Sequence, residues 1–183
     1  MIILYIQGLF IRMLSILSPD VNIRVMTKDE VLELLNNEHI DYELVEHQAV
    51  FTIDEMLGAG IPHPELIAKN LFVRDDKKRH YYLISVKEDR RVDLREFERE
   101  RCTRRLSFAS EEDLGRLLSL SKGGVTPMGL LNDREGKVEL YIDRYFEDKL
   151  IGVHPMVNTA TVFLSSSDLV SLIEKHGSKV SWL

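Results

Sequence analysis

The sequence predicts a mixed α/β domain with a largely antiparallel sheet or a barrel-like core, flanked by helices. Two observations indicate this class: β-rich runs and helix starts are interleaved irregularly, and many strand pairs are separated only by short turns. A doubly wound parallel sheet would instead show regular strand–helix alternation. With 183 residues, of which 44% are hydrophobic and 30% charged, the chain is long enough for one domain with a substantial core.

The N-terminus differs from the rest of the chain. "MIILYIQGLFIRML" is apolar, but it is too short to span a bilayer and Arg12 interrupts it. It has no charged segment ahead of the apolar run and no small-residue cleavage site, unlike a signal peptide. We therefore expect residues 1–25 to be an appendage or the result of an upstream start codon. Residues 26–183 are expected to form the functional domain.

Capping residues and prolines mark the expected helix starts. Thr27 and Glu30 have capping-box spacing ahead of an apolar stripe, and Ser110 with Asp113 begins another helix. The helices are expected to begin at Thr27, Thr52, Pro64, Asp93, Ser110 and Ser167. The last of them is expected to end at Gly177.

β-rich runs predict the strands. "LFVRDDKKRHYYLISV" (71–86) contains two such runs around a charged turn, which is typical of a hairpin. "KGGVTPMGLL" (122–131) is predicted to be a glycine–proline loop that enters a strand. The other expected strands are residues 42–45, 104–110, 137–143, 150–153 and 161–165.

Charge and cysteine content exclude several functional classes. The net charge of −6 argues against a protein that wraps DNA with its whole surface, although local basic patches remain available. These patches would be built from Lys77, Lys78, Arg79, Arg101, Arg104 and Arg105. The single cysteine, Cys102, excludes an internal disulfide and fits a reducing cytoplasm. The six histidines lack metal-binding spacing, so we expect no metal site. Taken together, charge, cysteine content and the missing signatures lead us to expect a cytoplasmic protein with no cofactor, membrane or DNA partner.

Three polar segments remain as candidates for chemistry, because the common hydrolase, metalloprotease and nucleotide-binding signatures are absent. In "AKNLF", Lys69 and Asn70 stand where a short helix is expected to run into a core strand. A cation and an amide on a rigid element could hold a phosphate or a polarised carbonyl. The alternative is that both residues only decorate the surface.

The other two segments are a glycine loop and a histidine at a strand end. In "GGVTP", residues 123–127, exposed backbone N–H groups could bind an anion or a developing oxyanion, or the loop could be a plain turn. In "GVHPMVNTATVFLS", His154 lies just before a buried strand. A single histidine in this position is more often structural than catalytic, and spacing alone does not decide between the two.

The ordered set of segments resembles the YbaK/ProX family of editing domains related to bacterial prolyl-tRNA synthetase. The resemblance covers roughly residues 27–183 and runs through "AVFTIDE", "AKNLFVRDDKKRHYYLISV", "LSFASEEDLGRLL", "GGVTPMGLLND" and "GVHPMVNTATVFLSSSDL". "KNLF" together with "SFASEEDL" is more similar to the branch that deacylates Ala-tRNA(Pro) in trans than to the Cys-tRNA(Pro) branch.

This resemblance implies a role for each matched residue. Lys69 would hold a phosphate or the ribose, and Asn70 would orient the aminoacyl group. Gly123 matches the first position of a G-x-x-x-P loop whose backbone donors support the ester carbonyl. His154 matches an HPxxN segment that shapes and polarises the pocket. The implied substrate-binding residues are Thr52, Gly124, Val125, Thr126, Pro127, Pro155 and Asn158.

The resemblance also implies the reaction and its specificity. Similar proteins hydrolyse the ester of a mischarged small amino acid on tRNA(Pro), without a metal and with help from the ribose hydroxyl, so Cys102 is not expected to be a nucleophile. The pocket would accept alanine and exclude the bulkier proline, with Ile67, Val125 and Met156 as candidate walls. Met156 and Met128 depart from the leucine and the phenylalanine, respectively, that are expected in the family, which bears on pocket size.

The expected partners are the acceptor end of tRNA(Pro) and, as a further candidate, prolyl-tRNA synthetase. Two alternatives stay open: a deacylase for Cys-tRNA(Pro) or another mischarged tRNA, and a non-catalytic tRNA- or synthetase-binding module of the same fold.

Overall fold

A computed structural model describes residues 25–50, 58 and 60–183 of the chain. The predicted appendage, apart from Val25, and the helix expected to begin at Thr52 lie outside these residues. The α-helices of the described part are α2 (Lys28–Asn37), α4 (Leu94–Glu100), α5 (Glu111–Leu118) and α6 (Ser166–Lys175). Its short 3-10 helices are η1 (Pro64–Leu66), η2 (Pro127–Asn132) and η3 (Arg144–Phe146).

The strands form two sheets, so the predicted mixed α/β class is confirmed. A five-stranded sheet has the order β4-β2-β3-β5-β8, and a three-stranded sheet has the order β1-β7-β6. The strands are β1 (Tyr42–Glu46), β2 (Ala68–Asp75), β3 (Tyr81–Lys87), β4 (Leu106–Phe108), β5 (Val138–Ile142), β6 (Leu150–Val153), β7 (Ala160–Ser165) and β8 (Val180–Trp182). Most pairs are antiparallel, but β5 lies parallel to both β3 and β8.

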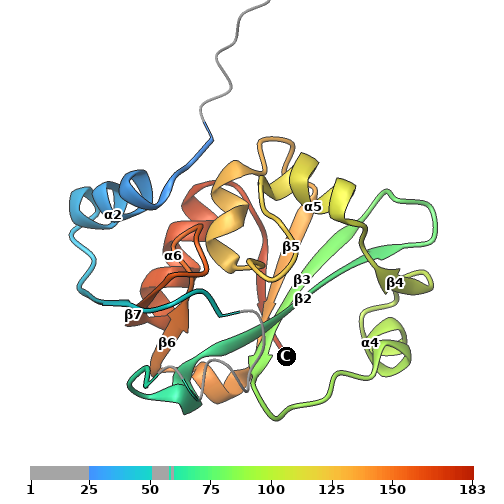
Figure 1. Cartoon of the computed structure of the whole chain (residues 1–183). Helices are drawn as coiled ribbons and strands as arrows, with labels where there is room; N and C mark the ends of the chain where they lie inside the picture. The colour runs from blue at the N-terminus through green and yellow to red at the C-terminus, as the bar shows by residue number, and fades with distance from the viewer. Residues whose placement is uncertain (1–24, 51–57, 59) are drawn as a thin grey trace, which may run out of the picture.

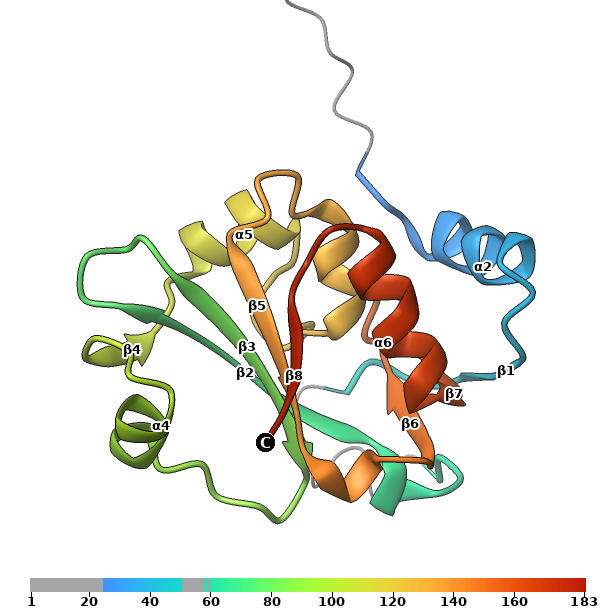
Figure 2. The same cartoon turned by 180° about the vertical axis from the view of Figure 1, so that it is seen from behind.

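Helices cover both faces of the five-stranded sheet (Figure 1). The larger core joins one face of this sheet to α2, α5, η2, α6 and the three-stranded sheet. A second core on the other face is closed by Phe97 of α4, which lies beside β4 at one end of the sheet. Seen from behind, α6 lies beside the C-terminal strand β8 (Figure 2).

The predicted hairpin is confirmed, but its first strand begins earlier than expected. η1 ends at Leu66 and β2 begins at Ala68, so the AKN residues belong to a strand and not to a helix. The hairpin pairs β2 with β3 in antiparallel register, including Asn70 opposite Ser85. This correction matters for the site because neighbouring residues of a strand point to opposite faces of the sheet.

Three further expectations were wrong in detail. The strand expected after the glycine loop is the 3-10 helix η2, since Thr126 caps it and Pro127, with its fixed φ, suits the first helical position. The last helix is capped by the hydroxyl of Ser165 and not by Ser167, whose backbone N–H is the donor to that hydroxyl. The run 104–110 forms only the short strand β4. The edge strand β8 was not predicted.

The two sheets touch at Gly152 of β6. Gly152 forms an isolated parallel bridge with Ile67, just ahead of β2. A Cβ atom at position 152 would lie 2.7 Å from Cε1 of Phe163 and 3.1 Å from Cγ1 of Ile67, which is too close for a side chain. Glycine thus allows the backbone contact that holds β6 against the start of β2.

A buried carboxylate holds α5 against the hairpin. Asp113 accepts hydrogen bonds from Tyr81 Oη (2.9 Å), Ser110 Oγ (2.9 Å) and Arg116 Nη2 (3.1 Å). Burial acts to raise the pKa of Asp113, but the hydrogen bonds from Ser110, Tyr81 and Arg116 outweigh it and lower the pKa to about 2. The charged form is therefore the one that the fold binds.

We predict that Asp113→Asn lowers the free energy of unfolding at neutral pH by about 2 kcal/mol, because charge-assisted hydrogen bonds become neutral ones. Since the pKa of Asp113 is lower in the folded state, its contribution is present above about pH 4 and is lost as the pH falls towards about 2. Urea unfolding across this range should show the difference between variant and wild type shrinking with acidity. The exposed neighbour Glu112 supplies the matched control, Glu112→Gln, and an equal effect of both substitutions would contradict the prediction.

Candidate active site

Asn70 is the first member of a hydrogen-bonded group that spans the two sheets. Its side chain is on the same face of β2 as the buried residues Ala68 and Phe72 of the larger core. Ser85 Oγ donates to Asn70 Oδ1 at 2.6 Å, and Asn70 Nδ2 donates to the carbonyl oxygen of Val125 at 2.9 Å. These two contacts fix the orientation of the amide and attach β2 to the glycine loop.

The glycine loop connects Asn70 to His154. Gly123 has φ of 85°, a conformation that favours glycine, and allows the loop to turn towards β2. Thr126 is fully buried, and its hydroxyl donates to the carbonyl oxygen of His154 at 2.7 Å. The N–H of Gly124 donates to Ser121 O at 3.0 Å. The backbone N–H groups of Gly123 and Val125 have no acceptor among the described residues.

The HPxxN segment forms the far side of the site. It runs from His154, just after β6, to Asn158, just before β7. The backbone N–H of Val50 donates to Asn158 O at 3.1 Å, and Asn158 Nδ2 returns a hydrogen bond of 3.4 Å to Val50 O. Met156, which lies between His154 and Asn158, adopts φ of 66°, which is uncommon for a residue with a long side chain. The turn is thus tightly held at both ends.

The imidazole of His154 is half-buried and uncharged at neutral pH. Burial, followed by the charge of nearby His47, lowers the pKa of His154 to about 4. Neither ring nitrogen has a hydrogen-bond partner among the described residues. A neutral imidazole with free nitrogens can donate one hydrogen bond to a ligand and accept another.

A cleft of about 650 Å³ opens beside these segments. Gly124 comes from the glycine loop, and Met156 and Asn158 come from the HPxxN segment. The remaining lining residues are Gly115, Ser119, Leu120, Ser121, Val157 and Thr159. Its size lies in the range of small-molecule sites, and its wall combines apolar side chains with hydroxyls and an amide.

Lys69 is not part of this group. Its side chain is on the opposite face of β2 from Asn70, with its ammonium group donating to Glu88 O at 2.8 Å and also to Arg90 O. The structure therefore brings together Asn70, the 123–127 loop and the HPxxN segment, including buried Pro155, but leaves Lys69 on the other side of the sheet. Thr52 lies outside the described residues.

His47 lies beside His154, and sequence reasoning missed it. The ring centroids of the two histidines are 6.1 Å apart. His47 comes directly after β1, and the only signal in the sequence was its place at the end of a predicted strand, next to the "AVFTIDE" segment.

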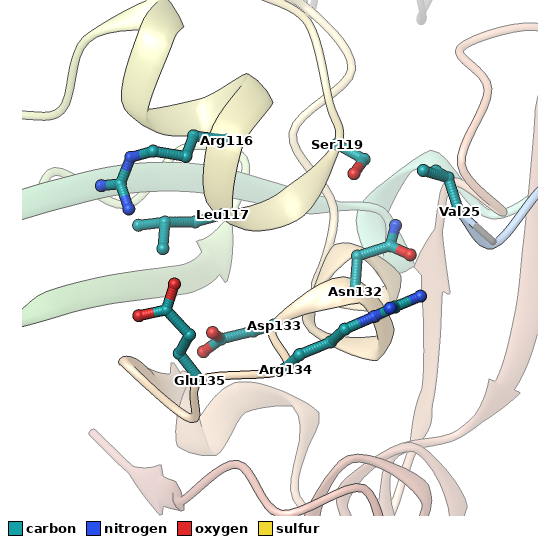
Figure 3. A pocket seen from close by; sticks show the side chains of 8 residues that line it. All are labelled: Val25, Arg116, Leu117, Ser119, Asn132, Asp133, Arg134 and Glu135. Carbon is teal, nitrogen blue, oxygen red and sulfur yellow. The ribbon is translucent and has the colours of Figure 1, made fainter. Parts of the chain in front are cut away.

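A second, smaller pocket of about 190 Å³ lies between α5 and η2 (Figure 3). It is lined by Val25, Arg116, Leu117, Ser119, Asn132, Asp133, Arg134 and Glu135, none of which was predicted as a site residue. Burial raises the pKa of Asp133, whose carboxylate lies near that of Glu135 in Figure 3. This pocket does not touch Asn70 or His154.

The described residues contain no group of three or more His, Cys, Asp or Glu side chains that could hold a metal ion. Among the helices of residues 25–50, 58 and 60–183, none is long and apolar enough to cross a membrane.

Comparisons with known proteins identify the family. The aminoacyl-tRNA editing domain family matches residues 47–172. "Prolyl-tRNA editing protein ProX" of Acetoanaerobium sticklandii is 40% identical over 151 residues, which cover 82% of this chain and 92% of that protein. "Prolyl-tRNA synthetase associated domain-containing protein 1" of Danio rerio is 34% identical over 151 residues, with 81% and 82% of the two chains covered.

Solved structures agree on the fold. The crystal structure of the hypothetical protein APE2540 superposes with a TM-score of 0.63 at 21% identity, over 84% of this chain and 97% of that chain. The resemblance to the YbaK/ProX family inferred from the sequence is thus confirmed by both sequence and fold. The chain belongs to the aminoacyl-tRNA editing domain family.

Proposed function

We propose that this protein is a trans-editing deacylase that hydrolyses the ester of mischarged Ala-tRNA(Pro). The observation that carries the proposal is the hydrogen-bonded group of Asn70, the 123–127 loop and His154. An open cleft adjoins this group at Gly124 of the loop, although Asn70 and His154 do not line it. The names of the relatives support a prolyl-tRNA substrate. The similarity of "KNLF" and "SFASEEDL" to the alanine branch supports alanine as the amino acid.

The reaction needs positioning and charge stabilisation more than a strong nucleophile. Water attacks the ester carbonyl carbon, the carbonyl oxygen gains negative charge, and the bond to the ribose oxygen then breaks. The ribose oxygen takes up a proton, and the free amino acid leaves. The free N–H groups of Gly123 and Val125 stabilise the developing oxyanion, and the amide of Asn70 keeps the loop that carries them in place.

His154 acts in this proposal through hydrogen bonding. With a pKa of about 4, its imidazole is a poor proton acceptor at neutral pH, although it can still bind and orient a hydroxyl or a water molecule. The neighbouring ribose hydroxyl of the substrate helps to activate the water. No metal is assigned a role in this scheme.

In this proposal the ammonium group of Lys69 binds the phosphate or the ribose of the terminal nucleotide. Its ammonium group currently binds two neutral backbone carbonyls, those of Glu88 and Arg90. A phosphate oxygen is a stronger acceptor than either, and the flexible stem of lysine lets the ammonium group exchange partners.

Size selects the amino acid. Met156 lines the cleft, Val125 packs against the larger core beside the loop, and buried Ile67 lies against Gly152. Such walls accept alanine and exclude proline by steric overlap, which is the reverse of the selection that a synthetase pocket makes.

The acceptor stem would be held by cations away from the ester. The basic residues predicted at the hairpin turn lie beyond Asp75, five residues along β2 from Asn70, or roughly 17 Å at the usual rise of a strand. Arg104, from the second predicted basic cluster, is already paired with Asp76 of this turn. We therefore expect tRNA binding to be weak and to decrease with added salt.

We predict that the purified protein, assayed with a chelator present, removes alanine from Ala-tRNA(Pro) much faster than it removes proline from Pro-tRNA(Pro). Cys-tRNA(Pro) is the third substrate to compare, and release of labelled amino acid is the measurement. Faster release of cysteine would keep the mechanism but replace the substrate. Loss of activity with the chelator would refute the metal-free scheme, and no hydrolysis at all would favour a binding module.

We predict that Lys69→Ala loses most of its turnover on the best of these substrates, because the terminal nucleotide is no longer held at its phosphate or ribose. Single-turnover deacylation measures the loss. Lys28→Ala is a matched control, since Lys28 is a half-buried lysine of α2 that pairs with Glu46 on a different sheet. Unchanged turnover in Lys69→Ala would argue against the role given to this cation.

We predict that Asn70→Asp, which has almost the same shape, lowers the rate of deacylation by about 100-fold. The new carboxylate cannot donate to Val125 O and repels it, so the glycine loop moves away from the ester, and a misplacement of about 1 Å can cost this much. The KM for the charged tRNA should change far less than kcat. A rate within a few-fold of wild type would show that the loop does not depend on Asn70.

A further inference from the structure

His47 has a ring that is held in a fixed position. Its backbone N–H donates to Thr159 O at 3.0 Å and so continues the β1–β7 ladder by one residue, up to the end of the HPxxN segment. The ring is held at both nitrogens, with Nδ1 2.8 Å from Gln48 O and Nε2 3.0 Å from Thr161 Oγ1.

These contacts determine the tautomer. A backbone carbonyl can only accept, so Nδ1 of His47 carries the hydrogen that it donates to Gln48 O. In the neutral ring Nε2 is then an acceptor, and the hydroxyl of Thr161 donates to it. Thr161 is fully buried on β7, so its hydroxyl depends on this partner.

The held ring lies against His154. The two ring centroids are 6.1 Å apart and the ring planes meet at 45°. Among the described residues, His47 is the titratable side chain whose charge acts on His154. The nitrogens of His154 have no hydrogen-bond partner among the described residues, so packing sets the orientation of its ring, and the His47 ring is one of the groups beside it.

We infer that His47 is a positioning residue for the deacylation reaction: its clamped ring holds the imidazole of His154 in place. His47 itself does not need to touch the substrate. The clamp consists of Gln48 O, the His47 ring and Thr161 Oγ1, and it acts on the reaction only through His154. This inference rests on the proposed function.

The experiment compares His47→Asn, Thr161→Val and the control His39→Asn. Thr161→Val keeps the size of the side chain and removes only the donor to Nε2. His39 is exposed and adopts φ of 57°, a conformation that asparagine tolerates, so His39→Asn makes the same chemical change away from the site. Circular dichroism and thermal unfolding check that each variant is folded.

We expect His47→Asn to lower kcat at least 10-fold with little change in KM, Thr161→Val to lower it by a smaller factor, and His39→Asn to leave it unchanged. The ring signals of His154 in NMR titrations of labelled protein should also move to higher pH in His47→Asn, because a neighbouring positive charge is removed. The acid limb of the pH–rate profile should move in the same direction. An unaltered kcat and an unaltered His154 titration in both clamp variants would overturn the inference.

The NMR titration separates this inference from the proposed function. If the wild-type protein hydrolyses none of the charged tRNAs, the proposed function fails and the role of His47 in hydrolysis fails with it. The titration still shows whether His47 controls the protonation of His154. If the wild type is active and both clamp variants behave like the control His39→Asn, the inference about His47 fails while the proposed function stands.

Discussion

One buried hydroxyl determines how the two loops of the site lie relative to each other. Thr126 Oγ1 donates to the carbonyl of His154 and accepts the N–H of Met128, so the same atom anchors the turn after β6 and caps η2. A buried backbone group that loses its partner costs about 1–3 kcal/mol, so this contact resists opening. The place of His154 therefore depends on how η2 packs in the core, where Pro127, Met128, Gly129 and Leu130 are all buried.

The site assembled in this way is built from uncharged groups. Asn70 contributes an amide, the loop contributes backbone N–H groups, and His154 is a neutral imidazole because burial and His47 lower its pKa. A neutral ester carries little charge until the transition state, in which its oxygen becomes negative. Fixed dipoles therefore favour the transition state over the bound ester, which is the difference that accelerates a reaction. In the proposed reaction the released amino acid is a carboxylate, and a site without a fixed cation does not retain it strongly.

Much of the fold could be predicted from local signals, and the departures have local causes. The capping box at Thr27 and the hairpin between β2 and β3 were confirmed because turn and cap chemistry acts within a few residues. The strand expected after the glycine loop became η2 because Thr126 and Pro127 form a helix start, a stronger signal than the apolar residues that follow. The edge strand β8 has only three residues, and its pairing with β5 depends on tertiary contact.

The candidate site was predictable in some of its segments but not in its geometry. The ordered motifs identified Asn70, the glycine loop and the HPxxN segment, and the structure connects them. No pattern in the sequence could show that Thr126 supplies the connection, because its partner is a backbone carbonyl 28 residues away. His47 was missed for a similar reason, since its ring meets Thr161 across a strand pair and 114 residues of chain.

The alternation of side chains along β2 gives a physical reason for placing Lys69 and Asn70 next to each other. Adjacent residues of a strand face opposite ways, so the charged lysine and the neutral amide are separated by the sheet. An aminoacylated nucleotide has the same division, because its phosphate and its ester are on different sides of the ribose. A cation beside the ester would stabilise the carboxylate product and oppose its release, whereas a cation behind the strand can hold the phosphate without doing so. In the proposed reaction, the Lys-Asn pair at the start of a strand thus provides two kinds of contact to one nucleotide while keeping the reaction centre neutral.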